Sequence, residues 1–237
     1  MKGRFGIAVI GVLGVAALVA LCVWQVQRLT WKEGVIAVLE QRLAGEPVAL
    51  PVAFEPETQE FSRVRISGVF SGEPGAHGYP DAPLLMSLRP HGPGYRVIQP
   101  FDLTDGRRVM VDRGYAPVAE KNENGAAARL IPAPVETVEL TGALRWPDEG
   151  GDGASFGARD NVWTARDLGV MAELFAAEPV LIVSETSTAV GDWPIPQPIA
   201  AINVPNNHLG YALTWGALAV IWAGMTSLMA YRVPRTS

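Results

Sequence analysis

Two charge-free apolar runs, one near each end of the chain, constrain the fold more than any other feature. The first extends from Phe5 to Gln27 and the second from Leu209 to Tyr231. Because about 20 apolar residues in an α-helix cross the hydrocarbon core of a bilayer, each run predicts a transmembrane helix. A secretory signal is the alternative for the first run, since Lys2 and Arg4 give it a basic start. The run is longer than a signal peptide needs, so we expect an uncleaved anchor.

The basic residues outside the two runs predict the orientation. Lys2 and Arg4 precede the first run, and Arg232 and Arg235 follow the second. Basic residues favour the cytoplasmic side, so both tails are expected there. The sequence shows no Arg/Ser-rich transit peptide before the first run, which favours a multi-pass protein of the bacterial inner (cell) membrane with its central domain on the periplasmic side. The expected order is a cytoplasmic tail at 1–4, a transmembrane helix at 5–27, an extracytoplasmic domain at 28–207, a transmembrane helix at 208–231 and a cytoplasmic tail at 232–237.

The central segment is acidic and lacks cysteine. It holds all 24 Asp and Glu residues and 15 of the 19 Lys and Arg residues. A surface that follows phosphates would need the opposite sign, so we expect no nucleic acid partner. The single cysteine, Cys22, lies in the first apolar run, which excludes an intrachain disulfide and a CxxC copper or redox site.

Several alternating patterns predict strands in the central segment. The stretch "RVRISGVF" puts Val64 and Ile66 on one face and Arg63 and Arg65 on the other, as in a half-buried strand. Two β-rich runs in "GYRVIQPFDLTDGRRVMVDRGYAP" meet at the Asp-Gly pair 105–106, which favours the tight turn of a hairpin. Further strands are predicted in "VETVELTGALRW" and "EPVLIVSET".

Helical spacing appears twice in the central segment. An amphipathic helix is predicted after the first apolar run, ending before Gly45 and Pro47. A second is predicted in "TARDLGVMAELF", where Leu168, Met171 and Phe175 share one face. Residues 71–94 are expected to form a long loop with one short strand at 84–88. The fold class is therefore membrane-anchored α+β, with two transmembrane helices flanking one antiparallel β-rich extracytoplasmic domain.

His208 is the most informative single residue, because it stands at the head of the second apolar run. A helix starting there places it on one stripe with four small residues, Ala212, Gly216, Ala219 and Ala223. One interpretation is that the stripe packs against the first helix and the histidine anchors the helix end at the interface. The other is that a neutral imidazole, next to a shallow groove, ligates the iron of a flat apolar cofactor such as haem.

The outer end of the first run carries the stretch "WQVQRLTWK", with tryptophans at 24 and 31. Two tryptophans seven residues apart share a helical face and suit an interfacial aromatic belt. Arg28 between them has an alternative use, as a cation for an anionic group such as a haem propionate.

The remaining polar residues do not form a recognisable catalytic centre. His77, His91 and Asp81 are weak candidates for a metal site, since nothing fixes their geometry, and a surface loop explains them more simply. The acidic residues of "DEGGDGASFGARD" lack the order of a calcium loop. The sequence has no nucleophile elbow, phosphate loop or HExxH helix. We therefore expect a protein that is not an enzyme.

The ordered motifs together resemble the surfeit-locus-one family of cytochrome c oxidase assembly factors. The resemblance extends nearly from end to end and rests on motifs in family order: "WQVQRLTWK", "RVRISGVF", "GYRVIQPFDLTDGRRVMVDRGYAP", "NVWTARDLGVMA", "EPVLIV" and "NNHLGYALTWGALA". It implies the same two-helix topology and a role in the maturation of haem-copper terminal oxidases, in bacteria through binding of haem a.

The resemblance also implies a set of site residues. His208 would be the haem iron ligand. The other expected cofactor-binding residues are Trp24, Gln25, Arg28, Tyr211 and Trp215, and Arg113, Gly114 and Tyr115 match the family's "RGY/F" element. Haem a would be a transient cargo, and the partners would be the catalytic subunit of the oxidase, the enzymes of haem a synthesis and the lipid bilayer. A membrane-tethered scaffold that stabilises assembly intermediates without holding haem is the alternative.

Overall fold

The structure is a computed structural model that describes residues 2–73, 75–76, 80–117, 134, 136–147, 156–157, 162–189, 191–200 and 206–232. The chain divides into two compact units. One comprises Met1–Glu40 with Ala201–Ser237, and the other comprises Gln41–Ala200. The two units are described separately below.

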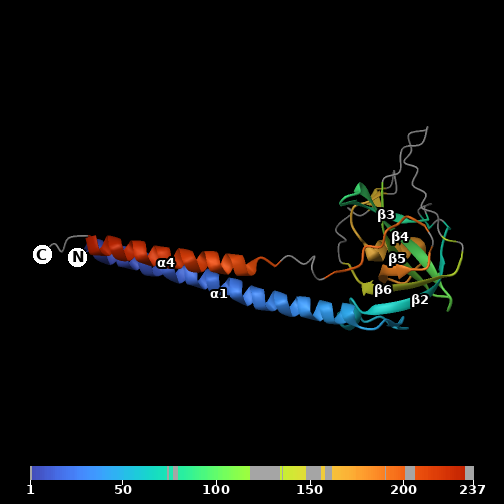
Figure 1. The fold of residues 1–237 in the computed structure, drawn as a ribbon, viewed down its shortest axis with the longest axis horizontal. Coiled ribbons are helices and arrows are strands. Elements are labelled where there is room, and N and C mark those ends of the chain that lie inside the picture. Colours follow the sequence, from blue (N-terminus) through green and yellow to red (C-terminus); the bar gives the residue numbers. More distant parts are fainter. Residues whose placement is uncertain are drawn as a thin grey trace, which may run out of the picture. The chain divides into compact units, whose positions relative to one another are not determined.

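The first unit is a pair of long helices, α1 (Lys2–Ala44) and α4 (His208–Arg232). Helix α1 joins the first apolar run and the predicted amphipathic helix in one continuous element. Both helices are long and apolar enough to cross a membrane. They lie side by side, with the start of α1 next to the end of α4 (Figure 1), and Gly14 lies against Trp222 while Cys22 contacts Ala212. The helices are therefore antiparallel.

The second unit is built from strands with two short helices. Its elements are β1 (Val48–Ala49), α2 (Pro56–Gln59), β2 (Arg63–Phe70), β3 (Ala82–Leu88), β4 (Gly92–Leu103), β5 (Arg108–Pro117), β6 (Val138–Arg145), β7 (Phe156–Gly157), β8 (Val162–Trp163), α3 (Leu168–Phe175) and β9 (Leu181–Ser187).

Five of these strands close into a barrel. Within the described residues the strand order is β1-β2-β6-β9-β5-β4-β3-β8-β7, and β2 also pairs with β4. In that closing pair, Gly68, Val69 and Phe70 lie opposite Leu103, Asp102 and Phe101. The ring is thus β2-β6-β9-β5-β4, and closure removes the free edges that an open sheet of these strands would expose. A Cβ at Gly68 would come within 2.1 Å of the Asp102 carbonyl oxygen, so the closing pair needs glycine there.

The prediction of an antiparallel sheet is wrong, because the sheet is mixed. The pairs β5–β9, β1–β2 and β3–β8 are parallel. Within the barrel, β9 lies between β5 and β6 and is antiparallel to β6 alone. The reason is geometric: strand directions cannot alternate around a ring with an odd number of strands, so a five-stranded barrel must contain a parallel pair.

Two apolar cores lie on opposite faces of the barrel wall. The barrel interior holds the side chains of Val64, Ile66, Phe70, Phe101, Leu103, Val109, Val111, Val138, Leu140, Leu144, Val180 and Ile182. A second core covers the outer face with Met110, Leu181 and Val183 of the wall, Trp163 of β8, and the predicted face of α3. Strands β5 and β9 are buried on both faces, which explains their continuous apolar runs.

Local predictions in this unit have mixed outcomes. The hairpin at 105–106 is confirmed: Asp102 pairs with Arg108, and Gly106 has a positive φ of 87°. The predicted long loop over 71–94 is wrong in part, because β3 starts at Ala82 and β4 at Gly92, so the two strands form a second hairpin. Pairing with β3 outweighs the turn signals of the Gly and Pro residues at the start of β4.

Candidate functional site

The first candidate site lies where α4 begins. His208 is the first residue of α4 and is half-buried, and the preceding Asn207 accepts a hydrogen bond from the backbone N–H of Tyr211. Because the helix starts here, the imidazole lies at the N-terminal end of α4, opposite the middle of α1. This is the position that the sequence predicted for it.

Gln25 of α1 forms a hydrogen bond with the imidazole of His208. The side chain of Gln25 is 8% exposed, and its Oε1 lies 2.8 Å from His208 Nδ1. An amide oxygen can only accept, so Nδ1 carries the proton in this arrangement, and in the neutral imidazole Nε2 then has the lone pair. A hydrogen bond of this kind fixes the tautomer and the ring orientation of metal-ligating histidines. The arrangement can therefore present Nε2 as a donor to a metal.

The small-residue stripe of α4 packs against α1. Ala212 and Ala219 are buried, and Cys22 Sγ of α1 donates a hydrogen bond to the Ala212 carbonyl oxygen at 3.3 Å. A Cβ at Gly216 would lie 3.7 Å from the same sulfur. The expected shallow groove beside His208 is therefore occupied by the partner helix over this part of the stripe, because small residues let the two backbones approach closely.

The other predicted site residues lie on the outer surface of the helix pair. Trp24 is 50% exposed, and Tyr211 is 56% exposed. Arg28 is exposed and stacks over the Trp31 ring, with its Cζ 4.5 Å from the ring centroid. Trp215 is half-buried. The structure thus joins His208 to Gln25, while among the described residues no hydrogen bond or ring contact joins the other four to the histidine.

The "RGY" element lies in the second unit, where it binds a segment that we call the 193–197 segment (Trp193–Gln197). Tyr115 exchanges two backbone hydrogen bonds with Ile195, at 2.8 and 2.7 Å, and its ring lies 5.9 Å from that of Trp193. Gly114 has a positive φ of 109°, and a Cβ there would come within 2.0 Å of the Ile195 carbonyl oxygen. Glycine is therefore required for the segment to lie on β5.

A buried ion pair completes this attachment, and the sequence reading did not identify it. Arg96 Nε donates to Asp112, which is fully buried, and Arg96 Nη2 donates to the Gln197 carbonyl oxygen at 2.8 Å. Asp112 also accepts from the Gly114 N–H at 3.1 Å. Burial raises the pKa of Asp112, against the lowering effect of Arg96. A signal was available: Asp112-Arg113 is a charged pair inside an otherwise apolar strand.

Metal sites in the second unit receive no support from the described residues. His91 is exposed in the turn between β3 and β4, where its ring lies 5.5 Å from that of Trp193. Asp81 is buried, and His77 and the acidic residues at 148, 149, 152 and 160 lie outside the described residues. Among the described residues, no group of three His, Cys, Asp or Glu side chains could hold a metal ion.

Comparison with known proteins identifies the family. The sequence profile of the SURF1 family matches residues 12–220. The chain belongs to the SURF1 family. It is 30% identical to Surfeit locus protein 1 of Gallus gallus, over 91% of this chain and 72% of the relative. It is 30% identical to Surfeit locus protein 1 of Homo sapiens, over 83% and 68%, and 32% identical to the SURF1-like protein of Monosiga brevicollis, over 85% and 79%.

The extent of the SURF1-family match matters for the candidate site. It begins inside α1 and ends inside α4, so it includes both Gln25 and His208 together with the complete barrel. The family resemblance therefore covers the helix pair as well as the barrel unit.

Proposed function

We propose that this SURF1-family protein is an assembly factor for haem-copper cytochrome c oxidase that binds haem a and helps deliver it to the catalytic subunit. Membership of the family supports the role in oxidase assembly. The haem-binding part rests on one observation, the hydrogen bond between Gln25 Oε1 and His208 Nδ1. That bond directs the lone pair of the imidazole to Nε2, the atom that would ligate the iron.

The surroundings of His208 suit a flat, apolar, anionic cargo. Trp24 and Tyr211 expose ring faces that can cover a macrocycle, and Trp215 stands one turn further along α4 from Tyr211. Arg28 is an exposed cation on α1, three residues after Gln25, and could pair with a propionate of the cargo. A site with one protein ligand holds the haem less tightly than a closed site with several ligands. It therefore allows release of the haem as well as binding.

Transport by a membrane protein has a physical reason. Haem a exposes a large apolar area whose hydration is costly, so it does not diffuse freely through water. A helix pair in the bacterial inner membrane can receive the cargo from the enzymes of haem a synthesis without passing it through solvent. The barrel unit, on the periplasmic side, would dock on the oxidase subunit. The protein itself would catalyse no reaction.

The test is a visible absorption spectrum of the purified full-length protein, co-expressed with the haem a synthesis enzymes. We expect a haem a band in the wild type and none in His208→Ala. Gln25→Ala should weaken haem binding about 10- to 100-fold, the usual cost of losing an outer-shell partner of a metal ligand. Gln27→Ala is the matched control, because Gln27 is an exposed amide on the same helix. Equal bands in the wild type and in His208→Ala would contradict the proposed ligand.

A scaffold without haem is the second candidate, and one observation favours it. The stripe at Ala212, Gly216 and Ala219 packs against α1. The Gln25–His208 hydrogen bond joins the same two helices, so it also has a purely structural role in stabilising their contact. A scaffold would show no haem band in a host that makes haem a, and His208→Ala would leave oxidase assembly intact. Loss of both the band and assembly in that variant would exclude it.

A further inference from the structure

Two buried side-chain oxygens stand out among the described residues, because nothing donates a hydrogen bond to them. They are Glu178 Oε2 and Asn206 Oδ1. Glu178 Oε2 lies 3.8 Å from Arg107 Nη1, so an ion pair compensates that oxygen. Asn206 has no charge, so no ion pair can replace the hydrogen bond that its oxygen lacks. A buried acceptor without a donor is costly, and in a native protein it calls for an explanation.

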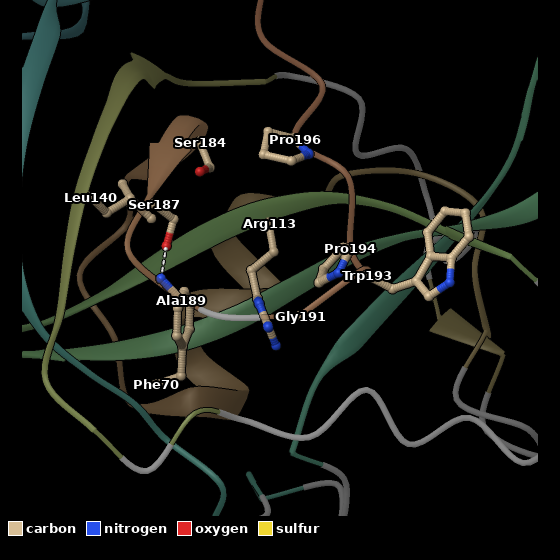
Figure 2. A pocket seen from close by; sticks show the side chains of 10 residues that line it. All are labelled: Phe70, Arg113, Leu140, Ser184, Ser187, Ala189, Gly191, Trp193, Pro194 and Pro196. Carbon is tan, nitrogen blue, oxygen red and sulfur yellow. Dashed lines mark hydrogen bonds between the residues drawn. The ribbon is translucent and has the colours of Figure 1, made fainter.

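The polar groups at the mouth of the barrel need no such explanation. Arg113 and Ser187 are among the residues that line a pocket there (Figure 2). Arg113 Nη1 donates to Gln99 Oε1 at 2.5 Å, and the Ser187 hydroxyl accepts from the Ala189 N–H at 3.1 Å. The barrel unit itself supplies partners for these groups, whereas the head of α4 supplies none for Asn206 Oδ1.

Asn206 lies two residues before His208, the proposed iron ligand. Two residues of chain span at most about 7 Å, so both side chains leave the backbone at the head of α4. Asn206 is half-buried, whereas the intervening Asn207 is exposed. His208 is half-buried too, and its Nδ1 is hydrogen-bonded to Gln25. The unpaired acceptor therefore belongs to the same part of the molecule as the proposed haem site.

The chemistry of Asn206 Oδ1 defines what a ligand must offer. An amide oxygen accepts hydrogen bonds and cannot donate them. The propionates of haem a are ionised at neutral pH and, like its formyl group, can only accept. The one O–H donor of haem a is the hydroxyl of its hydroxyethylfarnesyl chain, at the rim of the macrocycle. Haem b has a vinyl group in that place and therefore offers no donor.

We propose that Asn206 Oδ1 accepts a hydrogen bond from the hydroxyl of haem a, and so selects haems with a hydroxyethylfarnesyl chain over haem b. The inference rests on the proposed haem a binding and adds a specificity-determining residue to it. A site that hydrogen-bonds a ligand hydroxyl discriminates strongly against an analogue without one, because its buried polar group is then left unpaired. Haem o keeps the hydroxyl and has a methyl group in place of the formyl, so Asn206 accepts it as well as haem a.

The test is titration of the haem-free full-length protein in detergent with haem a, haem o and haem b, followed by visible absorption. Asn206→Leu keeps the approximate size of the side chain and removes the acceptor. It should weaken the binding of haem a and haem o about 5- to 20-fold and leave haem b within about twofold of the wild type. Asn207→Leu is the matched control at the exposed neighbour and should keep the preference for haem a.

The outcomes separate this inference from the proposed function. If the wild type binds haem a and Asn206→Leu loses affinity for all three haems equally, or for none, the role of Asn206 is overturned and haem binding stands. If the wild type binds no haem, the proposed function fails and the inference fails with it.

Thermal unfolding of the haem-free protein distinguishes selection of the cargo from a structural role. Asn206→Leu removes a buried acceptor that has no partner, so the unfolding midpoint should stay level or rise. Loss of a hydrogen bond within the chain would instead lower the midpoint by about 2–4 °C. Such a fall would show that Asn206 has a structural partner and would overturn the inference.

Discussion

At the scale of single residues, two glycines of the barrel unit carry similar backbone conformations for different reasons. Gly106 has a φ of 87° in the β4–β5 turn, with no atom within 4 Å of the position a Cβ would take. Gly114 has a φ of 109°, and the Ile195 carbonyl oxygen occupies the place of its missing Cβ. The first glycine relieves backbone strain only, whereas the second also lets the 193–197 segment lie on β5.

The pair of glycines gives a matched prediction. Gly106→Ala should lower the free energy of unfolding by about 1–2 kcal/mol, the cost of a left-handed conformation for an L-residue. Gly114→Ala should lose about 1–3 kcal/mol more, because the clash with Ile195 displaces the segment. Chemical denaturation measures both losses, and limited proteolysis should cut near Trp193 in Gly114→Ala only. Equal losses in the two variants would show that the segment does not depend on Gly114.

Asp112 provides a pH-dependent prediction at the same scale. Burial raises its folded pKa above the ordinary value of 3.8. The folded state therefore holds the proton more tightly, so the stability gained from this group is complete below pH 3.8 and is lost as pH rises through the folded pKa. Asp112→Asn removes this titration.

The stability difference between the wild type and Asp112→Asn should therefore be most favourable to the wild type near pH 4 and shrink toward pH 7. Denaturant titrations at several pH values measure the difference. Asp105 does not disturb this range, because its pKa is lowered, mainly by a hydrogen bond from the Arg107 backbone, and it titrates below pH 3.8. A difference that grows with pH would contradict the assignment.

At the scale of elements, small residues set the contact between α1 and α4. A Cβ at Gly14 would come within 2.2 Å of Trp222 Nε1, and a Cβ at Gly11 would lie 3.0 Å from Thr226. Toward the other end of α4, the contacts are Cys22 with Ala212 and Gln25 with His208. Where apolar burial provides no driving force between helices, close approach of their backbones stabilises the contact.

This contact predicts a disulfide. Gly216→Cys places a Cβ 3.7 Å from Cys22 Sγ, so mild oxidation should cross-link the two helices within one chain. Gly210→Cys is the control, because nothing lies within 4 Å of that position. Mass spectrometry under non-reducing conditions distinguishes the intrachain bond from a dimer. Equal cross-linking of both variants would contradict the arrangement of the helices.

At the scale of the whole molecule, the barrel unit contains its own cores. The residues of both buried clusters, together with the partly buried ones packed against them, all lie between Leu50 and Ile199. Arg42 at the end of α1 donates to the Glu60 carbonyl oxygen at 2.7 Å, which marks where this unit begins. The unit should therefore fold without the helix pair.

A fragment of residues 41–200 should be soluble and unfold in one cooperative thermal transition. A fragment of residues 41–191 lacks the 193–197 segment, loses its bonds to Tyr115 and Arg96, and should have a lower midpoint. Near-UV circular dichroism follows both. A broad, non-cooperative transition in the longer fragment would show that the barrel depends on the helices.

Much of this protein could be predicted from the sequence where the signal is local. The two apolar helices, the Asp105-Gly106 hairpin and the buried face of α3 follow from run length, turn chemistry and helical spacing. The pairing of Gln25 with His208 could not follow from spacing, because the two residues stand 183 positions apart. The family motifs pointed to both residues but gave neither their bond nor the proton on Nδ1.

The sequence by itself determined the two apolar helices, helix α3, the five strands that form the barrel and the presence of a histidine at the head of the last helix, but it did not predict the β3–β4 hairpin. Only the tertiary structure decided that β2 pairs with β4 to close a five-stranded barrel, that β9 is therefore parallel to one neighbour, and that a bulge at Arg113 shifts the register between β4 and β5. The physical reason is that periodicity reports the face on which a side chain lies. Strand order, register and closure depend on which distant segments meet.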